Sequence, residues 1–542
     1  MLDIEQLSVR FSGQADSSPA VDRVSFSLRR GQAFCLVGES GSGKSLTALS
    51  LMRLLPGGAQ LSENVRLQFT DPETGVQTDL TQLDADVFRQ WRGRRIAMVF
   101  QEPMTSLNPV MTIGDQLAEA VLHSAADLSD TAVQVRVLDL LHAVQLTDGE
   151  RFVAAYPHRL SGGQRQRVMI AMALAGDPDI LIADEPTTAL DVTIQADVLR
   201  LLHRLQHTRN MALLFITHDL GIVAQLGDQV GVMHRGRIVE QGEVATVIGQ
   251  PQHPYTQALL ACLPQRLPRE PRVAASEMHS ERVPVLRIQD VCVDFPRQGG
   301  FWRRRTSAFR AVDKVSAAIA PGEILALVGE SGCGKTTLGR TVSRLVRPSA
   351  GFIQFQGHAL DTLSGRAWRG QCQIVFQDSA AALNPRLTLA TALTEPMKVI
   401  GKGESHADRL ELAAALLREV QLEPDMLWRL PHQLSGGQRQ RANVARALVQ
   451  DPVLMVCDEM TSALDVSVQA RVLELLLRLR EERGLAMLFI THDIGVVEYI
   501  SDRTAVMHQG RIVECGDTLQ VCQQPVNPYT RKLISAVPRI AL

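Results

Sequence analysis

Short apolar runs alternate along the chain with longer segments that have helical spacing. QAFCLVG (32–38) and DILIADE (179–185) are apolar runs that end in glycine or acidic residues, which is typical of buried strands. VQVRVLDLLHAV (133–144) and VLELLLRLREE (472–482) place apolar residues three and four positions apart, which predicts amphipathic core helices. Strands and helices that alternate in this way predict an α/β fold with a parallel sheet covered on both faces.

This pattern occurs twice. LDIEQLSVRF (2–11) returns as LRIQDVCVDF (286–295), and ALLFITH (212–218) returns as AMLFITH 274 residues later. The sequence therefore predicts one domain and its duplicate, joined by an exposed linker rich in proline and charge. TDPETGVQTDL (70–80) occurs in the first copy alone and predicts the turn of a surface hairpin. The second copy alone has the basic loop QGGFWRRRTSAFR (298–310), which we interpret as a solvated hairpin tip.

Composition narrows the class of protein. A chain of 542 residues is too long for one core, and 45% hydrophobic with 21% charged residues describes an ordinary globular protein. Lys+Arg at 56 against Asp+Glu at 58 gives a net charge of −2, so we expect no nucleic-acid partner. The eight cysteines are scattered without a C-x-x-C pair, which is typical of reduced thiols in a cytosol. No apolar run has the length of a membrane span, although the chain could dock on a membrane protein.

Each copy has a glycine-rich octet between an apolar strand and a helix. GESGSGKS (38–45) and GESGCGKT (329–336) both fit G-x-x-x-x-G-K-[ST]. Glycines let the backbone curl so that several N–H groups point into one concavity, and the helix N-terminus adds partial positive charge. The lysine is expected to reach the β- and γ-phosphates, and the last hydroxyl to bind Mg²⁺. The predicted nucleotide-binding residues are Gly38, Ser40, Gly41, Gly43, Lys44, Ser45, Gly329, Ser331, Gly332, Gly334, Lys335 and Thr336.

Further polar motifs follow in the same order in both copies. A glutamine comes after an apolar strand, at Gln101 and Gln377. LSGGQRQR then opens a helix and offers a second anion cradle, built from backbone N–H groups and the helix dipole. DEPTTALD (184–191) or DEMTSALD (458–465) comes next, and each copy closes with the histidine of ITHD.

In this order, and twice over, the motifs resemble those of the nucleotide-binding subunits of ATP-binding cassette (ABC) transporters. The resemblance covers nearly the whole chain outside the linker. It implies tandem P-loop NTPase domains, each with a parallel-sheet core, a small antiparallel β part and a helical subdomain. The first cassette is expected over residues 1–262, the linker over 263–283 and the second cassette over 284–542.

The resemblance also implies roles for the motif residues. Each ATP is expected to lie between the P-loop of one copy and the LSGGQ of the other, which pairs Lys44 with Ser435 and Gly437, and Lys335 with Ser161 and Gly163. The glutamates that polarise the attacking water and the histidines that contact the γ-phosphate are Glu185, Glu459, His218 and His492. The residues expected to hold Mg²⁺, directly or through water, are Ser45, Gln101, Asp184, Thr336, Gln377 and Asp458. Phe11 and Phe295 are expected to stack on adenine, with a core phenylalanine as the alternative.

Two positions depart from the family pattern. Met460 stands where the family has proline after the catalytic glutamate, so the loop loses a fixed φ but no reactive group. Cys333 lies in the second P-loop where the first has Ser42. Since neither change removes a catalytic residue, both sites are expected to hydrolyse ATP.

SLNP (106–109), ALNP (382–385) and the tails HPYTQALLACLP (253–264) and NPYTRKLISAVP (527–538) resemble the oligopeptide/dipeptide/nickel branch of ABC importers. The resemblance implies a peripheral protein on the cytoplasmic face of the bacterial inner membrane. It would bind two integral membrane permease subunits and, through them, a periplasmic substrate-binding protein. Peptides are the expected cargo, while nickel, metal chelates and glutathione-like compounds stay open. Cys515 and Cys522 lack the cluster pattern of many relatives, so no iron–sulfur cluster is expected.

Two other functions compete with the importer. Twin-cassette translation factors share the tandem layout but join their halves by a long charged helical arm, whereas this linker is short and proline-rich. An ATPase that energises export is the third possibility, and a neighbouring gene for a periplasmic binding protein would argue against it.

Overall fold

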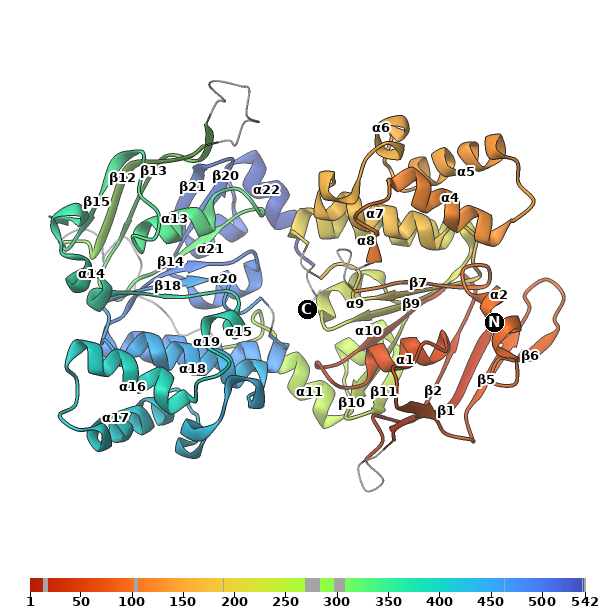
Figure 1. The fold of residues 1–542 in the computed structure, drawn as a ribbon, viewed down its shortest axis with the longest axis horizontal. Helices are drawn as coiled ribbons and strands as arrows, with labels where there is room; N and C mark the ends of the chain where they lie inside the picture. Colours follow the sequence, from red (N-terminus) through yellow and green to blue (C-terminus); the bar gives the residue numbers. More distant parts are fainter. Residues whose placement is uncertain are drawn as a thin grey trace. The chain divides into compact units, whose positions relative to one another are not determined.

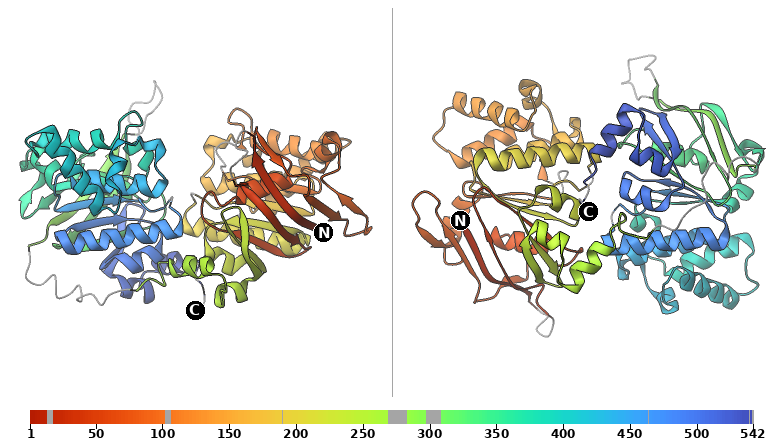
Figure 2. Two further views of the ribbon diagram at one scale, coloured as in Figure 1. Left: turned by 90° about the horizontal axis from the view of Figure 1, so that it is seen from below. Right: turned by 180° about the vertical axis from the view of Figure 1, so that it is seen from behind.

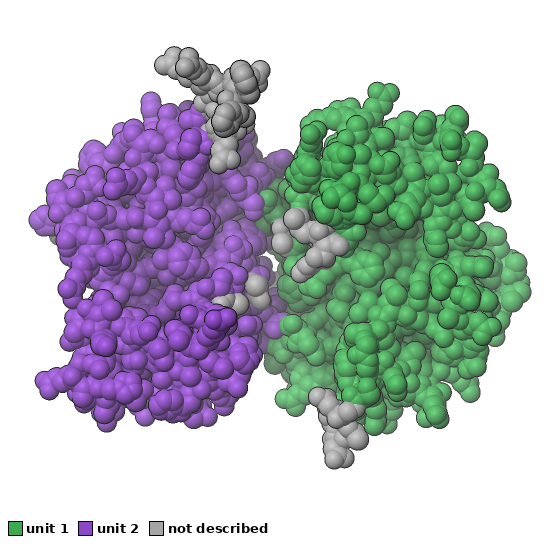
Figure 3. All heavy atoms as spheres, in the orientation of Figure 1, with its two compact units in different colours: residues 1–261, 538–542 green, residues 262–537 purple. Residues whose placement is uncertain are grey.

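The computed structural model describes residues 1–12, 18–101, 106–188, 190–268, 283–296, 308–462, 464–538 and 540. These residues form two compact units, residues 1–261 with 538–542 and residues 262–537 (Figure 3). Most of the predicted linker (263–283) and of the basic loop (298–310) lies outside the described residues, so the interpretations of both segments stay predictions.

Unit 1 is built on a six-stranded sheet with the order β11-β10-β3-β9-β8-β7 (Figure 1). All neighbours run parallel except the antiparallel pair β10 and β11. Strands β3, β8 and β9 are the predicted apolar runs, and every residue in them is buried. The strands are β3 (Ala33–Val37), β7 (Ile96–Val99), β8 (Ile180–Asp184), β9 (Ala212–Thr217), β10 (Gln229–His234) and β11 (Arg237–Glu243).

A smaller antiparallel sheet has the order β2-β1-β5-β6, with β4 also paired to β1. Its strands are β1 (Leu2–Phe11), β2 (Val21–Leu28), β4 (Ala59–Leu61), β5 (Arg66–Thr70) and β6 (Gln77–Asp79). Strands β5 and β6 form the hairpin predicted for the extra segment of the first copy, which is confirmed. A core cluster that includes Leu2, Phe26, Leu36 and Leu51 joins this sheet to the large sheet and to α1 (Lys44–Leu51).

The helical part of unit 1 lies at the opposite end of the unit from the antiparallel strands (Figures 1 and 2). The segment predicted as an amphipathic helix (133–144) corresponds to α5 except for its last residue. Helix α5 buries Val133, Val137 and Leu140 while Val135 and Leu138 stay exposed. Besides α1, the α-helices among the described residues of this unit are α2 (Ala85–Trp91), α4 (Ile113–Ser124), α5 (Asp130–Ala143), α6 (Gly149–Val153), α7 (Gly162–Ala173), α8 (Val192–Arg209), α9 (Leu220–Leu226), α10 (Val244–Gly249) and α11 (Pro254–Ala261).

Unit 2 repeats this architecture. Its six-stranded sheet has the order β17-β18-β19-β14-β20-β21 and its antiparallel sheet the order β13-β12-β15-β16. The strands are β12 (Leu286–Phe295), β13 (Phe309–Ile319), β14 (Ile324–Val328), β15 (Ala350–Phe355), β16 (His358–Ala359), β17 (Cys372–Val375), β18 (Leu454–Asp458), β19 (Ala486–Ile490), β20 (Arg503–His508) and β21 (Arg511–Asp517). The helices are α13 (Lys335–Val342), α14 (Gly365–Gln371), α15 (Ser379–Ala382), α16 (Leu389–Ile400), α17 (His406–Glu419), α18 (Gly436–Leu448), α19 (Val466–Arg483), α20 (Ile494–Ile500), α21 (Thr518–Gln523) and α22 (Pro528–Ser535).

The predicted fold class is confirmed in both units: a parallel-sheet core, a small antiparallel part and a helical part. Among the residues described, none of the helices has the length and apolar character needed to cross a membrane. In each unit the polar motifs lie where parallel strands end at one edge of the large sheet, which is where α/β folds bind ligands.

Candidate nucleotide-binding and hydrolysis sites

The two octets form tight turns from β3 into α1 and from β14 into α13. Gly43 and Gly334, which precede the helices, have φ angles of 105° and 109°, a left-handed conformation that favours glycine. A Cβ atom on Gly38 would lie 2.2 Å from the carbonyl oxygen of Met233, so the first position also excludes a side chain. The loop glycines are therefore required by the turn itself and by its contact with the end of β10.

The P-loop lysines fold back over these turns. Lys44 Nζ donates to the carbonyl oxygens of Gly38 at 2.8 Å and Glu39 at 2.9 Å, and its side chain is buried. Lys335 Nζ makes the equivalent bonds in unit 2, at 2.7 and 3.0 Å. Each ammonium group thus lies inside the concavity of its own loop, where the β- and γ-phosphates are predicted to bind.

A hydroxyl and an aspartate meet beside each loop. Ser45 Oγ donates to Asp184 Oδ1 at 3.1 Å, and Thr336 Oγ1 donates to Asp458 Oδ1 at 3.0 Å. Burial, with the nearby Glu185 charge, raises the pKa of Asp184 to about 6 and outweighs the Ser45 hydrogen bond and the Lys44 charge. A bound divalent cation would relieve this cost, and hydroxyl and carboxylate oxygens are the ligands that Mg²⁺ prefers. The residues present therefore fit a Mg²⁺ site.

The glutamates that follow have strained backbones. Glu185 has a φ of 44° and Glu459 a φ of 46°, a left-handed conformation that is costly for a residue with a side chain. The amide of Glu185 donates to the carbonyl oxygen of Ile216 in β9, and that of Glu459 donates to Ile490 in β19. These bonds fix the turn at the end of the strand and direct both carboxylates toward the neighbouring polar motifs.

The Glu185 carboxylate gathers the predicted residues of unit 1. It accepts from Gln101 Nε2 at 2.8 Å and Thr188 Oγ1 at 3.0 Å, and it lies 3.3 Å from His218 Nδ1. Burial raises the pKa of Glu185, but the hydrogen bond and charge of His218 lower it to about 2 overall. The hydrogen bond to Glu185 in turn raises the pKa of His218. A carboxylate of this kind stays ionised at neutral pH and can orient a water molecule.

Glu459 has related but weaker contacts. Gln377 Nε2 donates to it at 3.1 Å, His492 Nδ1 lies at 3.6 Å and Lys335 Nζ at 3.9 Å. The nearby His492 and the charge of Lys335 lower the pKa of Glu459 and outweigh the effect of burial, which raises it. Ser462 Oγ donates to the backbone carbonyl of Glu459 and not to its carboxylate. The two units thus differ in how the glutamate is held.

Thr188 is a site residue that the sequence analysis missed. Its hydroxyl contacts the Glu185 carboxylate directly, from three residues further along the chain. The signal available was a hydroxyl residue three positions after each glutamate, in DEPTT and DEMTS. Because the hydroxyl in DEMTS contacts the backbone instead, this spacing alone does not predict the contact.

The LSGGQ motifs begin the helices α7 and α18. Ser161 accepts from the Gln164 amide at 3.3 Å while Gln164 Oε1 accepts from the Ser161 amide at 3.0 Å, which is a capping box. A Cβ atom on Gly163 would lie 2.4 Å from Ile194 Cγ2 of α8, so this glycine is needed for helix packing. Gly437 has the same relation to Val468, at 2.2 Å. The predicted pairing of each P-loop with the LSGGQ of the other copy stays a prediction.

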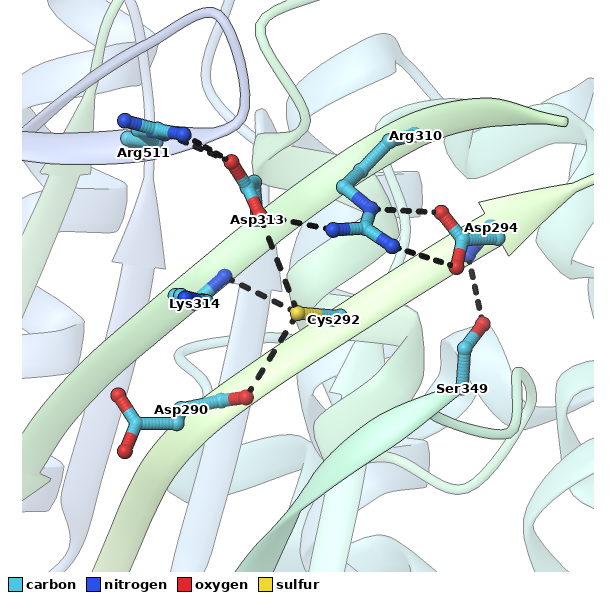
Figure 4. A network of polar contacts seen from close by, with 8 residues as sticks. All are labelled: Asp290, Cys292, Asp294, Arg310, Asp313, Lys314, Ser349 and Arg511. Atoms are coloured by element: carbon cyan, nitrogen blue, oxygen red, sulfur yellow. Dashed lines mark hydrogen bonds and ion pairs between the residues drawn. The ribbon is translucent and has the colours of Figure 1, made fainter. Parts of the chain in front are cut away.

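Phe11 and Phe295 lie at the ends of β1 and β12 with 38% and 40% of their surface exposed. Exposure of this size argues against the alternative that they are core residues. In unit 2 an ionic network holds the strands beside Phe295, since Arg310 pairs with Asp294 and Asp313, and Arg511 also pairs with Asp313 (Figure 4). These charges are partly exposed, so their contribution to stability is small.

Two family models match the chain. The model described as "ABC transporter" matches residues 21–188 and 312–462. The model described as "Oligopeptide/dipeptide transporter, C-terminal region" matches residues 239–292 and 513–541. Both models therefore match each copy of the duplicated sequence.

Curated relatives match nearly the whole chain. It is 46% identical over 565 residues to "Glutathione import ATP-binding protein GsiA" of Escherichia coli (strain K12), which covers 99% of this chain and 89% of that protein. The protein of the same name from Shigella sonnei (strain Ss046) has the same identity and coverage.

Solved structures match at lower identity. The dimeric structure of MJ0796, a bacterial ABC transporter cassette, is 26% identical with a TM-score of 0.39 and covers 45% of this chain and 99% of that chain. The cbiO1 structure from Clostridium perfringens is 24% identical with a TM-score of 0.39 and covers 45% of this chain and 92% of that chain. The family of the chain is therefore assigned from the family models and the curated relatives, and not from these solved structures.

Proposed function

The chain belongs to the ABC transporter family, and on that premise we propose that it hydrolyses ATP in both cassettes to drive import of a small peptide-like solute. The observation that carries this proposal is the presence of two complete sets of residues. Each unit brings together a P-loop lysine, a hydroxyl beside an aspartate, and a glutamate held by a glutamine and a histidine.

In the first cassette the P-loop amides and Lys44 bind the phosphates. Ser45 with Asp184 would hold Mg²⁺, which would neutralise negative charge on the phosphates when bound. Glu185 orients the attacking water through its ionised carboxylate. Gln101 and His218 lie against that carboxylate, so they are placed to report the presence of the γ-phosphate. The equivalent residues of the second cassette have the same roles.

The cargo is proposed from the curated relatives and the C-terminal matches. The relatives carry the name of a glutathione importer, and the C-terminal segments match the oligopeptide/dipeptide transporter region. Glutathione is itself a tripeptide, so both lines agree on a short peptide. We propose glutathione as the first candidate, followed by dipeptides and other short peptides.

The proposal implies partners at the membrane. As the ATP-binding subunit of an importer, the chain would act on integral permease subunits, and a periplasmic binding protein would deliver the cargo. We propose a peripheral position on the cytoplasmic face of the inner membrane. Cysteines introduced at Ser106 or Ala382, near the γ-phosphate-sensing glutamines in sequence, should crosslink to cytoplasmic loops of the permease. Crosslinks to ribosomal components alone would support the translation factor instead.

Transport is tested with the chain, its permease subunits and its binding protein in vesicles. ATP-dependent uptake of labelled glutathione should exceed that of an unrelated amino acid, and the chain carrying Glu185→Gln and Glu459→Gln should support no uptake. If a dipeptide were taken up and glutathione were not, the importer function would stand and glutathione would be replaced by a dipeptide as the proposed cargo. ATP hydrolysis without uptake of any peptide would contradict the importer.

A further inference from the structure

The C-terminal tail of each cassette is bound to the antiparallel hairpin of its large sheet. In unit 2 the Glu514 carboxylate, on β21, accepts from the amides of Val526 at 2.8 Å and Asn527 at 3.0 Å. In unit 1 Glu240 does the same on β11, accepting from two amides at 2.7 and 3.1 Å. The acid thus fixes the turn immediately before the last helix of each tail, α11 or α22.

An aromatic stack then attaches the tail to β20, the strand whose end lies against the P-loop. The ring of Tyr529 stacks on His508 with centroids 3.9 Å apart and planes 22° apart. His508 ends β20 and follows Met507, whose carbonyl oxygen would lie 2.1 Å from a Cβ atom on Gly329 of the P-loop. Unit 1 has the equivalent stack of Tyr255 on His234, at 3.9 Å and 14°.

The hydroxyl of Tyr529 reaches the second P-loop itself. The amide of Glu330, the second residue of the octet, donates to Tyr529 Oη at 3.2 Å. The next contacts along the loop are the carbonyl oxygens of Gly329 and Glu330, which accept from Lys335 Nζ. The tail therefore contacts the peptide unit between Gly329 and Glu330, just after β14. The carbonyl oxygens of the same two residues bind Lys335.

We propose that Tyr529 is a positioning residue for the nucleotide site of the second cassette, holding its P-loop in the conformation that receives phosphate. The inference rests on the proposed function, since it assumes that this loop binds ATP. It gives a role to the C-terminal segment, whose match to the oligopeptide/dipeptide transporter region includes Tyr529. The ring provides the anchor on His508 and the hydroxyl provides the contact with the loop.

Loss of the hydroxyl should weaken nucleotide binding without removing any group that touches the nucleotide. The apparent affinity of the loop for ATP is proportional to the fraction of molecules in which the loop has its binding conformation, so a smaller fraction gives weaker binding. One hydrogen bond of ordinary strength corresponds to roughly a 2- to 10-fold change in an equilibrium constant. We therefore expect Tyr529→Phe to raise the Kd for ATP by roughly 2- to 10-fold, and Tyr529→Ala, which also loses the stack, to raise it further.

The experiment uses the full chain carrying Lys44→Ala, so that nucleotide binds at the second P-loop alone. Binding of a fluorescent ATP analogue is titrated for the parent, Tyr529→Phe and Tyr529→Ala. The matched control is Tyr499→Phe, which removes the hydroxyl of another tyrosine of the same cassette, 6% exposed on α20. Steady-state kinetics in the chain with both lysines should show a raised KM for ATP with kcat nearly unchanged for Tyr529→Phe.

An unchanged Kd in Tyr529→Phe would overturn the inference, as would a change that appears equally in Tyr499→Phe and follows the loss of thermal stability. Lys335→Ala in the same background tests the assumption beneath it. If Lys335→Ala abolishes binding while Tyr529→Phe has no effect, the positioning role alone is wrong. If binding survives Lys335→Ala, the proposed nucleotide site is wrong and the role of Tyr529 falls with it.

Discussion

The second glycine of the first LSGGQ motif gives a prediction that depends on packing rather than on the nucleotide. Gly163 lies in the first turn of α7, where α7 packs against α8. An added Cβ atom would stand 2.4 Å from Ile194 Cγ2, more than 1 Å inside the roughly 3.5–4.0 Å of ordinary carbon contacts. Gly162, one residue earlier, offers a control because its nearest atom would be Leu190 Cδ2 at 3.5 Å.

The magnitude follows from two opposing effects of Gly163→Ala. Overpacking at a rigid contact costs about 1–3 kcal/mol, and replacing glycine in a helix returns up to about 1 kcal/mol. A net loss of about 1–2 kcal/mol in the free energy of unfolding is expected. For a domain of this size that loss lowers Tm by about 2–8 °C. Because the N-terminus of α7 must move, the position of Ser161 also changes and ATP hydrolysis should fall.

Calorimetry of the full chain measures the effect on the unfolding of the first cassette. Gly163→Ala should lower its transition, while Gly162→Ala should leave it unchanged or raise it slightly. Gly437→Ala should act on the second cassette in the same way, because its Cβ atom would lie 2.2 Å from Val468 Cγ1. Equal transitions for Gly163→Ala and Gly162→Ala would refute the packing argument.

Two further predictions concern the sites themselves. Burial raises the pKa of Asp184 to about 6, so below that pH protons compete with Mg²⁺ for the carboxylate. The Mg²⁺ concentration needed for half-maximal hydrolysis should therefore rise by up to about tenfold for each pH unit below about 6. The carboxylate is ionised above this pKa, so the Mg²⁺ requirement should level off toward pH 7, and a requirement independent of pH would contradict the assignment. Met460→Pro should change ATPase activity by less than about 3-fold. In the first cassette Glu185 precedes a proline, and Glu459 already has nearly the same φ without one, so a proline at position 460 should leave the backbone of Glu459 nearly unchanged. A large loss of activity at unchanged Tm would show that the methionine side chain itself matters.

The sequence predicted those parts of the site in which polar residues recur at a fixed spacing along the chain. The octets, the aspartate at the end of an apolar strand and the following glutamate are short-range patterns, and the structure brings them together at one edge of the sheet in each unit. Helical periodicity likewise predicted α5, and the turn-forming residues of 70–80 predicted the extra hairpin of the first copy, because both depend on local preferences.

Contacts that depend on tertiary packing could not be predicted in this way. The Thr188 hydroxyl contacts the Glu185 carboxylate, yet the matching hydroxyl of unit 2 turns to the backbone. Gly163 was interpreted as part of an anion cradle, whereas its neighbour Ile194 also requires a glycine there. The bond between Tyr529 and the P-loop joins segments 199 residues apart, beyond the reach of any local pattern.

The central claim is that both cassettes hydrolyse ATP. Its most direct test is the ATPase rate of the permease-bound chain carrying Glu185→Gln or Glu459→Gln. Because positioning of the attacking water supplies much of the catalysis, each substitution should lower hydrolysis at its own site on the order of 10²-fold or more. Each single variant should therefore lose at least about half of the total rate, and the double variant nearly all of it. If Glu459→Gln left the rate intact while Glu185→Gln abolished it, the second site would be inactive and the claim of two working sites would be contradicted.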